Sequence, residues 1–229
     1  MADRIVALLP MKAHSARVKS KNFAIFAGKP LYQWMLSTLI AMDEIDEIII
    51  NTDAHAELDA AGLGALNTRG KVRLRERPAE ICGDHVSMNL VIADDLANVA
   101  ADAYVMTHTT NPLLSGDTVR RALAAYSEAA KQGTADSLFT ANRVQSRFYR
   151  EDASPVNHDP NNLIRTQDLE PWFEENSNLY IFTRDSFAAT QARIGEKPLL
   201  FETPKLESLD IDGPDDWALA ESVALGQRP

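Results

Sequence analysis

The sequence predicts an α/β fold in which a mainly parallel sheet lies between layers of helices. Short apolar runs alternate with segments of helical periodicity through residues 4–131, an order typical of strand–helix–strand units. With 45% hydrophobic and 24% charged residues, the 229 residues carry enough apolar side chains for one sizeable core. We therefore expect a single domain over residues 1–229, with ligands beyond the carboxyl ends of the strands.

The elements follow from local patterns. Residues 4–9 form a short apolar run that Pro10 closes, which indicates a buried strand. Residues 71–75 alternate charged and apolar side chains, as strands at a sheet edge do. The other expected strands are 47–51, 103–106, 136–142 and 179–182, and the expected helices are 31–42, 54–66, 87–100, 117–131 and a last one that begins near Pro214.

One long segment fits no regular element. Residues 144–176 have no clean periodicity and contain Pro155, Pro160 and Pro171. A structureless stretch of this length is uncommon inside a compact domain. We expect it to leave the domain as an arm that reaches a partner subunit.

Charge and composition exclude several classes of protein. Acidic residues number 33 against 23 basic ones, so the net charge of −10 argues against nucleic acid as a partner. A local cluster of cations can still bind one nucleotide in an acidic protein. The single cysteine, Cys82, permits no disulfide within the chain. The first apolar run is too short for a signal peptide or a membrane span, which predicts a cytoplasmic protein with no membrane partner.

The loop after the first strand is the first candidate site. Lys12, Ser15, Arg17, Lys21 and Asn22 provide cationic, hydroxyl and amide donors within eleven residues, as a triphosphate requires. The loop has no glycine and therefore is not a Walker A loop. A solvated basic loop is the alternative, but its position after the first strand favours a binding role.

A pair of carboxylates near the C-terminus is the second candidate. Asp210 and Asp212, two residues apart in an extended segment, would lie on one side of the chain and could bind Mg²⁺. Acids that cap the following helix in a surface turn are an equally good explanation of the spacing.

Two other segments carry polar residues at strand ends. Arg77 and Pro78 follow the edge strand, and Asp84 lies a few residues further along. His108 opens a polar loop after the strand 103–106, where a substrate contact is expected, although a lone histidine is more often structural.

These segments, in this order, resemble the acylneuraminate (CMP-sialic acid) cytidylyltransferases and related CMP-sugar-acid synthetases over nearly the whole chain. The segments that carry the resemblance are 7–12 with 15, 21–22 and 28–31, then 50–53, 77–84, 108–113 and 209–215. The family's motifs at the last three are R-P-x-x-L-x-x-D, Q-P-T-S-P-L and D-I-D-x-x-x-D.

The resemblance implies a nucleotide-diphosphosugar-transferase-like fold and a homodimer whose arm crosses to the neighbouring site. It implies Mg²⁺-dependent transfer of CMP from CTP to the anomeric hydroxyl of a sialic-acid-like 2-keto-3-deoxy sugar acid, with release of pyrophosphate. By this likeness Lys21 and Asp212 are catalytic, and Asp210 and Asp212 bind the metal. The implied nucleotide-binding residues are Lys12, Ser15, Arg17, Asn22, Arg77, Asp84 and Ser87, and those for the sugar acid are His108, Arg165, Asn176 and Tyr180.

The sequence also departs from the family pattern. Lys12 replaces the usual arginine, His108 replaces a glutamine, and Glu174 replaces an arginine of the arm. These changes leave the sugar acid unidentified. A different nucleoside triphosphate, a different anionic acceptor such as a phosphonate, and a catalytically inactive nucleotide-binding homologue remain alternatives.

Overall fold

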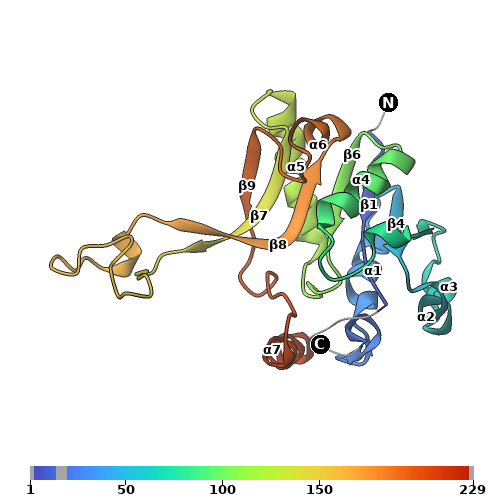
Figure 1. Cartoon of the computed structure of the whole chain (residues 1–229), viewed down its shortest axis with the longest axis horizontal. Coiled ribbons are helices and arrows are strands. Elements are labelled where there is room, and N and C mark those ends of the chain that lie inside the picture. The colour runs from blue at the N-terminus through green and yellow to red at the C-terminus, as the bar shows by residue number, and fades with distance from the viewer. Residues whose placement is uncertain (1–2, 14–19, 227–229) are drawn as a thin grey trace.

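The computed structural model describes residues 3–13 and 20–226, and the predicted residues Ser15 and Arg17 lie outside these ranges. A seven-stranded sheet in the order β5-β4-β1-β6-β8-β7-β9 forms its centre, beside a small β2-β3 hairpin (Figure 1). The strands are β1 (Ile5–Leu8), β2 (Ile25–Phe26), β3 (Lys29–Pro30), β4 (Glu47–Thr52), β5 (Val72–Glu76), β6 (Ala103–Thr107), β7 (Ser137–Val144), β8 (Trp172–Phe182) and β9 (Pro198–Glu202). The α-helices are α1 (Tyr32–Ala41), α2 (His55–Ala60), α3 (Leu63–Leu66), α4 (Met88–Asn98), α5 (Gly116–Lys131), α6 (Arg184–Thr190) and α7 (Pro214–Gly226).

The predicted fold class, a mainly parallel mixed sheet between helices, is confirmed. Strand β8 runs antiparallel to β6 and β7, whereas the pairs β1–β4, β1–β6, β4–β5 and β7–β9 are parallel. Successive residues of β1 alternate between the two faces, since Ala7 packs into one core cluster and Val6 and Leu8 into the other. Helices α1 and α5 cover the first face, and α4 and α6 cover the second.

The strand order places a ligand site beside β1. From β1 the chain passes to β4 and β5 on one side, and then returns to β6 on the other side. Loops that leave β1 and β6 therefore diverge at the carboxyl edge, and the crevice between them is where open α/β sheets bind ligands.

One predicted helix is wrong in extent. The expected helix 54–66 is two short helices, α2 and α3, because the chain turns at Gly62 with φ of 79°. That left-handed conformation suits glycine and ends a right-handed helix. Helix α6 and strand β9 were not predicted, and Thr183 and Ser186 form a capping box at the start of α6.

The irregular segment does project from the sheet. Strands β7 and β8 continue past the body as a two-stranded ribbon, and residues 145–171 form its tip (Figure 1). The predicted strand 179–182 therefore begins earlier, at Trp172, and the outer half of β8 is exposed while its inner half is buried. Tyr149 pairs with Pro155 in the tip, and the rings of Phe148 and Trp172 stack 5.2 Å apart.

Within the described ranges, no helix is both long and apolar enough to cross a bilayer.

Candidate active site

A cavity of about 560 Å³ opens at the carboxyl edge of the sheet. Its wall is built from residues that follow β1, β5 and β6, together with the segment before α7. The structure thereby brings together seven of the predicted site residues, which are Lys12, Lys21, Asn22, Arg77, Asp84, His108 and Asp212.

Asn22 ties the first loop to the loop after β6. Its side-chain amide donates to the Lys12 carbonyl at 2.9 Å, and its carbonyl oxygen accepts from the Thr109 hydroxyl at 2.7 Å. Both ends of the buried amide are thus held by protein atoms. The Lys12 ammonium pairs with the Asp84 carboxylate at the cavity wall, and this contact lowers the pKa of Asp84.

Lys21 is one of the two residues predicted to be catalytic, and it lies near the other, Asp212. It follows Ser20, whose φ of 50° turns the chain into the short 3-10 helix Lys21–Phe23. The Lys21 ammonium donates to the Ile211 carbonyl at 2.5 Å and lies 4.0 Å from an Asp212 carboxylate oxygen. With 11% of the side chain exposed, the cation is held in place at the cavity wall.

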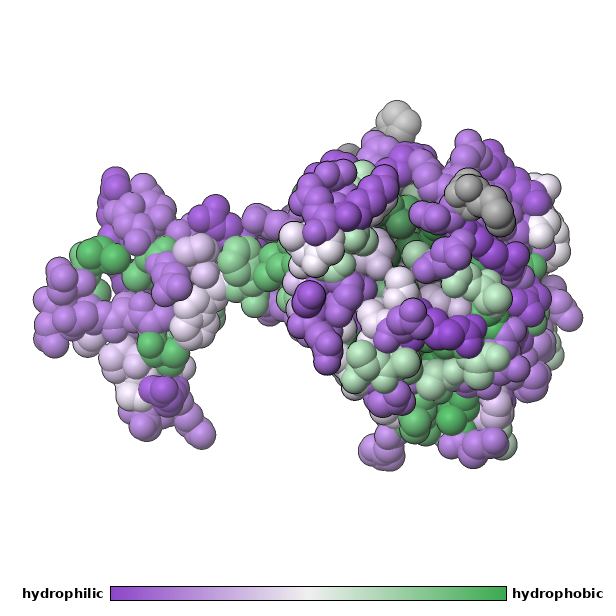
Figure 2. Space-filling view, turned by 90° about the horizontal axis from the view of Figure 1, so that it is seen from above, coloured by the Kyte–Doolittle hydropathy of each residue, from purple (hydrophilic) through white to green (hydrophobic). Residues whose placement is uncertain are grey.

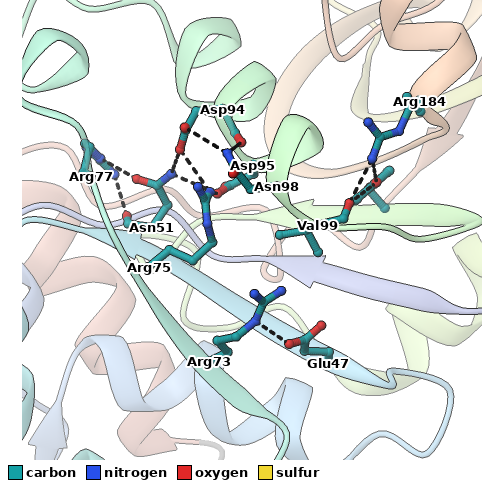
Figure 3. A network of polar contacts seen from close by, with 11 residues as sticks. Glu47, Asn51, Arg73, Arg75, Arg77, Asp94, Asp95, Asn98, Val99 and Arg184 are labelled. Carbon is teal, nitrogen blue, oxygen red and sulfur yellow. Dashed lines mark hydrogen bonds and ion pairs between the residues drawn. The ribbon is translucent and has the colours of Figure 1, made fainter.

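Arg77 is the most deeply buried cation of the cavity wall (Figure 3). Its guanidinium donates to the Asn51 side-chain oxygen at 3.0 Å, and to the carbonyls of Asn51 at 2.7 Å and Met11 at 3.1 Å. Burial lowers its pKa, and the nearby Asp53, Asp95 and Asp94 charges oppose that effect. Sequence reasoning found Arg77 but not the residues that orient it.

A second layer of charges holds Asn51. Its amide donates to Asp94 at 2.9 Å and to Asp95 at 2.8 Å, and the Arg75 guanidinium pairs with both carboxylates (Figure 3). Burial raises the pKa of Asp95 to about 6, while the hydrogen bonds from Asn51 and Arg75 oppose the rise. At pH 7 the carboxylate therefore stays largely ionised and accepts both donors.

The carboxylate pair fits a hard cation. Asp210 has a buried oxygen, Oδ1, that has no hydrogen-bond partner among the described residues, and Asp212 lies half exposed at the cavity wall. Burial raises the pKa of Asp210, a hydrogen bond with Thr110 and the Lys21 charge oppose the rise, and the Asp212 charge adds to it. The parts of the chain that are described contain no cluster of three or more potential ligands. Mg²⁺ typically uses one or two carboxylates and takes its other ligands from phosphates and water.

His108 also lines the cavity, next to an arginine that the sequence analysis missed. Burial, followed by the charges of Arg193 and Lys21, lowers its pKa to about 4. His108 is therefore neutral at pH 7 and can donate or accept one hydrogen bond without adding charge. Arg193 escaped prediction because it lies between α6 and β9, in a part of the chain where no element was expected.

Five of the predicted residues within the described ranges do not line the main cavity, and one of these is Asp210 of the carboxylate pair. The Ser87 side chain caps α4 by accepting from the Asn89 backbone. Asn176 bonds to Asn142 and Thr203 and thereby links β8 to β7 and to the residue that follows β9. Tyr180 is buried beneath Arg193, and Arg165 lies in the arm, paired with Asp168.

Cations gathered at the carboxyl edge of a parallel sheet, opposite a carboxylate pair, define a nucleotide-binding α/β enzyme. The sequence profile of the cytidylyltransferase family matches residues 6–227, so the chain belongs to this family and is a nucleotidyltransferase.

Solved structures share the fold at low sequence identity. The chain superimposes with a TM-score of 0.68 on a CMP:2-keto-3-deoxy-manno-octonic acid synthetase complexed with CTP, at 14% identity over 98% of this chain and 100% of that one. It superimposes with a TM-score of 0.66 on 4-diphosphocytidyl-2C-methyl-D-erythritol synthase from Anaerococcus prevotii, at 12% identity over 99% of this chain and 97% of that one.

Curated relatives bear out the resemblance seen in the sequence. The chain is 26% identical to the CMP-N,N'-diacetyllegionaminic acid synthase of Legionella pneumophila over 96% of both chains. It is 27% identical to the N-acylneuraminate cytidylyltransferase of Oncorhynchus mykiss, where the match covers 96% of this chain and 50% of that protein. It is 22% identical to the pseudaminic acid cytidylyltransferase of Campylobacter jejuni over 93% of both. The chain thus spans nearly the whole of the two bacterial relatives and half of the fish enzyme.

We predict that Asn51→Ala weakens CTP binding although Asn51 is absent from the cavity wall. The substitution removes the acceptor of the Arg77 Nε–H bond, so that only the Asn51 and Met11 carbonyls still orient the guanidinium. A lost hydrogen bond to a charged group corresponds to roughly 1.5–3 kcal/mol, or about a tenfold to hundredfold rise in the dissociation constant.

Titration calorimetry with CTP measures this change, with Asn98→Ala as the matched control. Asn98 also bonds to Asp94 but does not contact Arg77. Equal CTP affinity in the two variants would show that Asn51 does not orient Arg77.

Proposed function

We propose that this enzyme transfers CMP from CTP to the anomeric hydroxyl of a sialic-acid-like 2-keto-3-deoxy sugar acid and releases pyrophosphate. The observation that supports it most is the convergence of Lys12, Lys21 and Arg77 on one cavity beside the Asp210–Asp212 segment. The relatives named above, which act on legionaminic, neuraminic and pseudaminic acids, support the class of acceptor.

In the proposed reaction the anomeric oxygen attacks the α-phosphorus of CTP. A bond forms between the anomeric oxygen and the α-phosphorus, and the bond from the α-phosphorus to the oxygen that bridges to the β-phosphorus breaks. Pyrophosphate leaves with that bridging oxygen, and the hydroxyl proton passes to solvent water. Negative charge grows on the α-phosphate oxygens and on the departing pyrophosphate. Lys21 is the cation we assign to that charge, and Lys12 and Arg77 position the nucleotide.

We propose that Asp210 and Asp212 hold Mg²⁺. When bound, the ion supplies neutralisation of phosphate charge. The Lys21 ammonium, 4.0 Å from Asp212, keeps the carboxylate and the triphosphate-binding loop next to each other.

Pyrophosphate release from CTP, in the presence of Mg²⁺ and a panel of acceptors, tests the function. The panel contains neuraminic, legionaminic, pseudaminic and 3-deoxy-manno-octulosonic acids and a phosphonate. We expect at least one sugar acid to give its CMP derivative, CTP to be preferred over ATP, GTP and UTP, and chelation by EDTA to abolish turnover. Release with the phosphonate alone, or with no acceptor, would contradict the proposal.

Lys21→Ala should lower kcat more than it weakens CTP binding. Charge at the α-phosphate is greater in the transition state than in the ground state, so a cation placed there acts mainly on the rate. Loss of one preorganised charge donor costs roughly a hundredfold or more in kcat. Lys19→Ala, in the same stretch of sequence but outside the matched positions, is the control. If both variants lose activity equally, or if only the KM for CTP changes, Lys21 serves binding alone.

We also propose that the chain acts as a homodimer through its arm. Green patches lie on the projecting part of the surface in Figure 2. The large hydrophobic and aromatic residues that are exposed on the arm of the single chain are Tyr149, Val156, Leu163, Ile164, Trp172 and Phe173. Contact with a second copy would bury them and would bring Arg165 to the cavity of the neighbour.

Sedimentation at micromolar concentration should show a dimer. Leu163→Asp, which places a charge on the patch, should shift the protein toward monomer and reduce activity, because a buried unpaired charge opposes association. Glu151 is an exposed polar residue of the arm, so Glu151→Ala should leave the dimer and the activity unchanged. A fully active monomer would refute the shared site.

A further inference from the structure

A second cavity of about 340 Å³ adjoins the main one. Met88 lines both, and the rest of the second wall comes from the start of α4 and from residues 192–194. The cation that lines it is Arg193.

The Arg193 guanidinium stands at the junction of the two cavities. It stacks 3.8 Å from the centre of the buried Tyr180 ring, and it lies 3.5 Å from His108 Nε2, a residue of the main cavity. The charges of both Arg193 and Lys21 reach His108. The histidine thus lies near the arginine and also near the cation assigned to the phosphates.

The guanidinium retains hydrogen-bonding capacity for a ligand. Only 20% of its side chain is exposed, yet among the described residues its polar contacts are long, at 3.5 Å to His108 and 3.5 Å to Glu175. Glu175 is itself 42% exposed and also accepts from the Tyr180 hydroxyl. Five N–H donors in a planar group, stacked on an aromatic ring, match a carboxylate with two parallel bonds.

The segment that carries Arg193 is fixed to the sheet. The Asp136 carboxylate accepts from the backbone amides of Glu196 at 2.9 Å and Lys197 at 3.0 Å, and the Gly195 amide donates to Ser137 at 2.8 Å. A Cβ at Gly195 would come within 2.4 Å of Asp136, so the close approach requires glycine. Arg193 therefore lies two residues before a segment that is anchored to the start of β7.

On the basis of the proposed function, we infer that Arg193 binds the carboxylate of the acceptor sugar acid. In a 2-keto acid the carboxylate is attached to the anomeric carbon itself, so it lies close to the hydroxyl that attacks. An acceptor anchored at Arg193 would direct that hydroxyl past the neutral His108 toward the phosphates at Lys21. The ligand class of this site is accordingly a 2-keto sugar acid with a free carboxylate.

Arg193→Gln tests this assignment with the sugar acid that the wild-type enzyme uses and with its methyl ester. We expect the KM for the free acid to rise at least about tenfold, as for a lost charge-assisted hydrogen bond, while CTP affinity stays within about twofold. The preference for acid over ester should largely disappear, because the ester has no charge for Arg193 to bind. Arg193→Lys keeps the charge but loses the planar donor, so its KM for the free acid should lie between those of the wild type and Arg193→Gln.

Lys197→Gln, at an exposed cation of the same turn, is the matched control. It should retain the wild-type KM for the free acid and the wild-type affinity for CTP. Melting temperature and CTP titration establish that each variant is folded, and Arg193→Lys replaces Arg193→Gln if the latter is not. If the wild-type enzyme uses sugar acids, an unchanged KM of Arg193→Gln for the free acid, or an equal rise in KM for acid and ester, would overturn the role of Arg193. The proposed function would then still stand. A wild-type protein that accepts no sugar acid would overturn the proposed function together with this inference.

Discussion

The parallel alignment of β5, β4, β1 and β6 is the constraint on which the site depends. Because these four neighbouring strands point the same way, the loops at their carboxyl ends emerge along one edge of the sheet. Residues far apart in sequence, such as Lys12, Arg77 and His108, meet there without any direct attraction between them. The geometry of the site is thus set by apolar packing of helices on both faces, and the polar residues occupy positions that the sheet has already fixed.

The functional cations of this acidic protein lie in different electrostatic settings, since Lys12 pairs with Asp84 and Lys21 lies 4.0 Å from an Asp212 oxygen. Arg77 is buried against neutral acceptors, so its positive charge remains available at the cavity wall. The carboxylates of Asp94 and Asp95 are instead neutralised one step away, by Arg75. Asn51 lies between Arg77 and the two acids (Figure 3). Its side-chain nitrogen donates to Asp94 and Asp95, and its side-chain oxygen accepts from Arg77.

Sequence reasoning recovered those features that depend on local patterns. Apolar runs and helical periodicity located most strands and helices, and the site residues next to strand ends followed from them. It failed where a tertiary contact decides the outcome. Strand β9 is only partly buried and is held by pairing with β7, which no local signal reveals. The role of Asn51 depends on side chains 43 and 44 residues away in sequence, and Arg193 is placed by contacts with Tyr180 and with His108, which is 85 residues away.

The continuity of β8 limits how the length of this chain can change. One strand runs from the exposed Trp172 in the arm to the buried Tyr180 under Arg193. Pairing of β8 with β7 shifts register between Phe139 and Ala141, so β8 has a regular stretch on each side of this irregularity. Side chains alternate between the two faces of a strand, so one residue inserted in either regular stretch would turn its neighbours to the opposite face. The tip at residues 145–171 lies outside the paired strands and carries no such restriction. Insertions and deletions can therefore alter the reach of the arm at its tip, while the ribbon behind it must keep its register for the cavity to keep its shape.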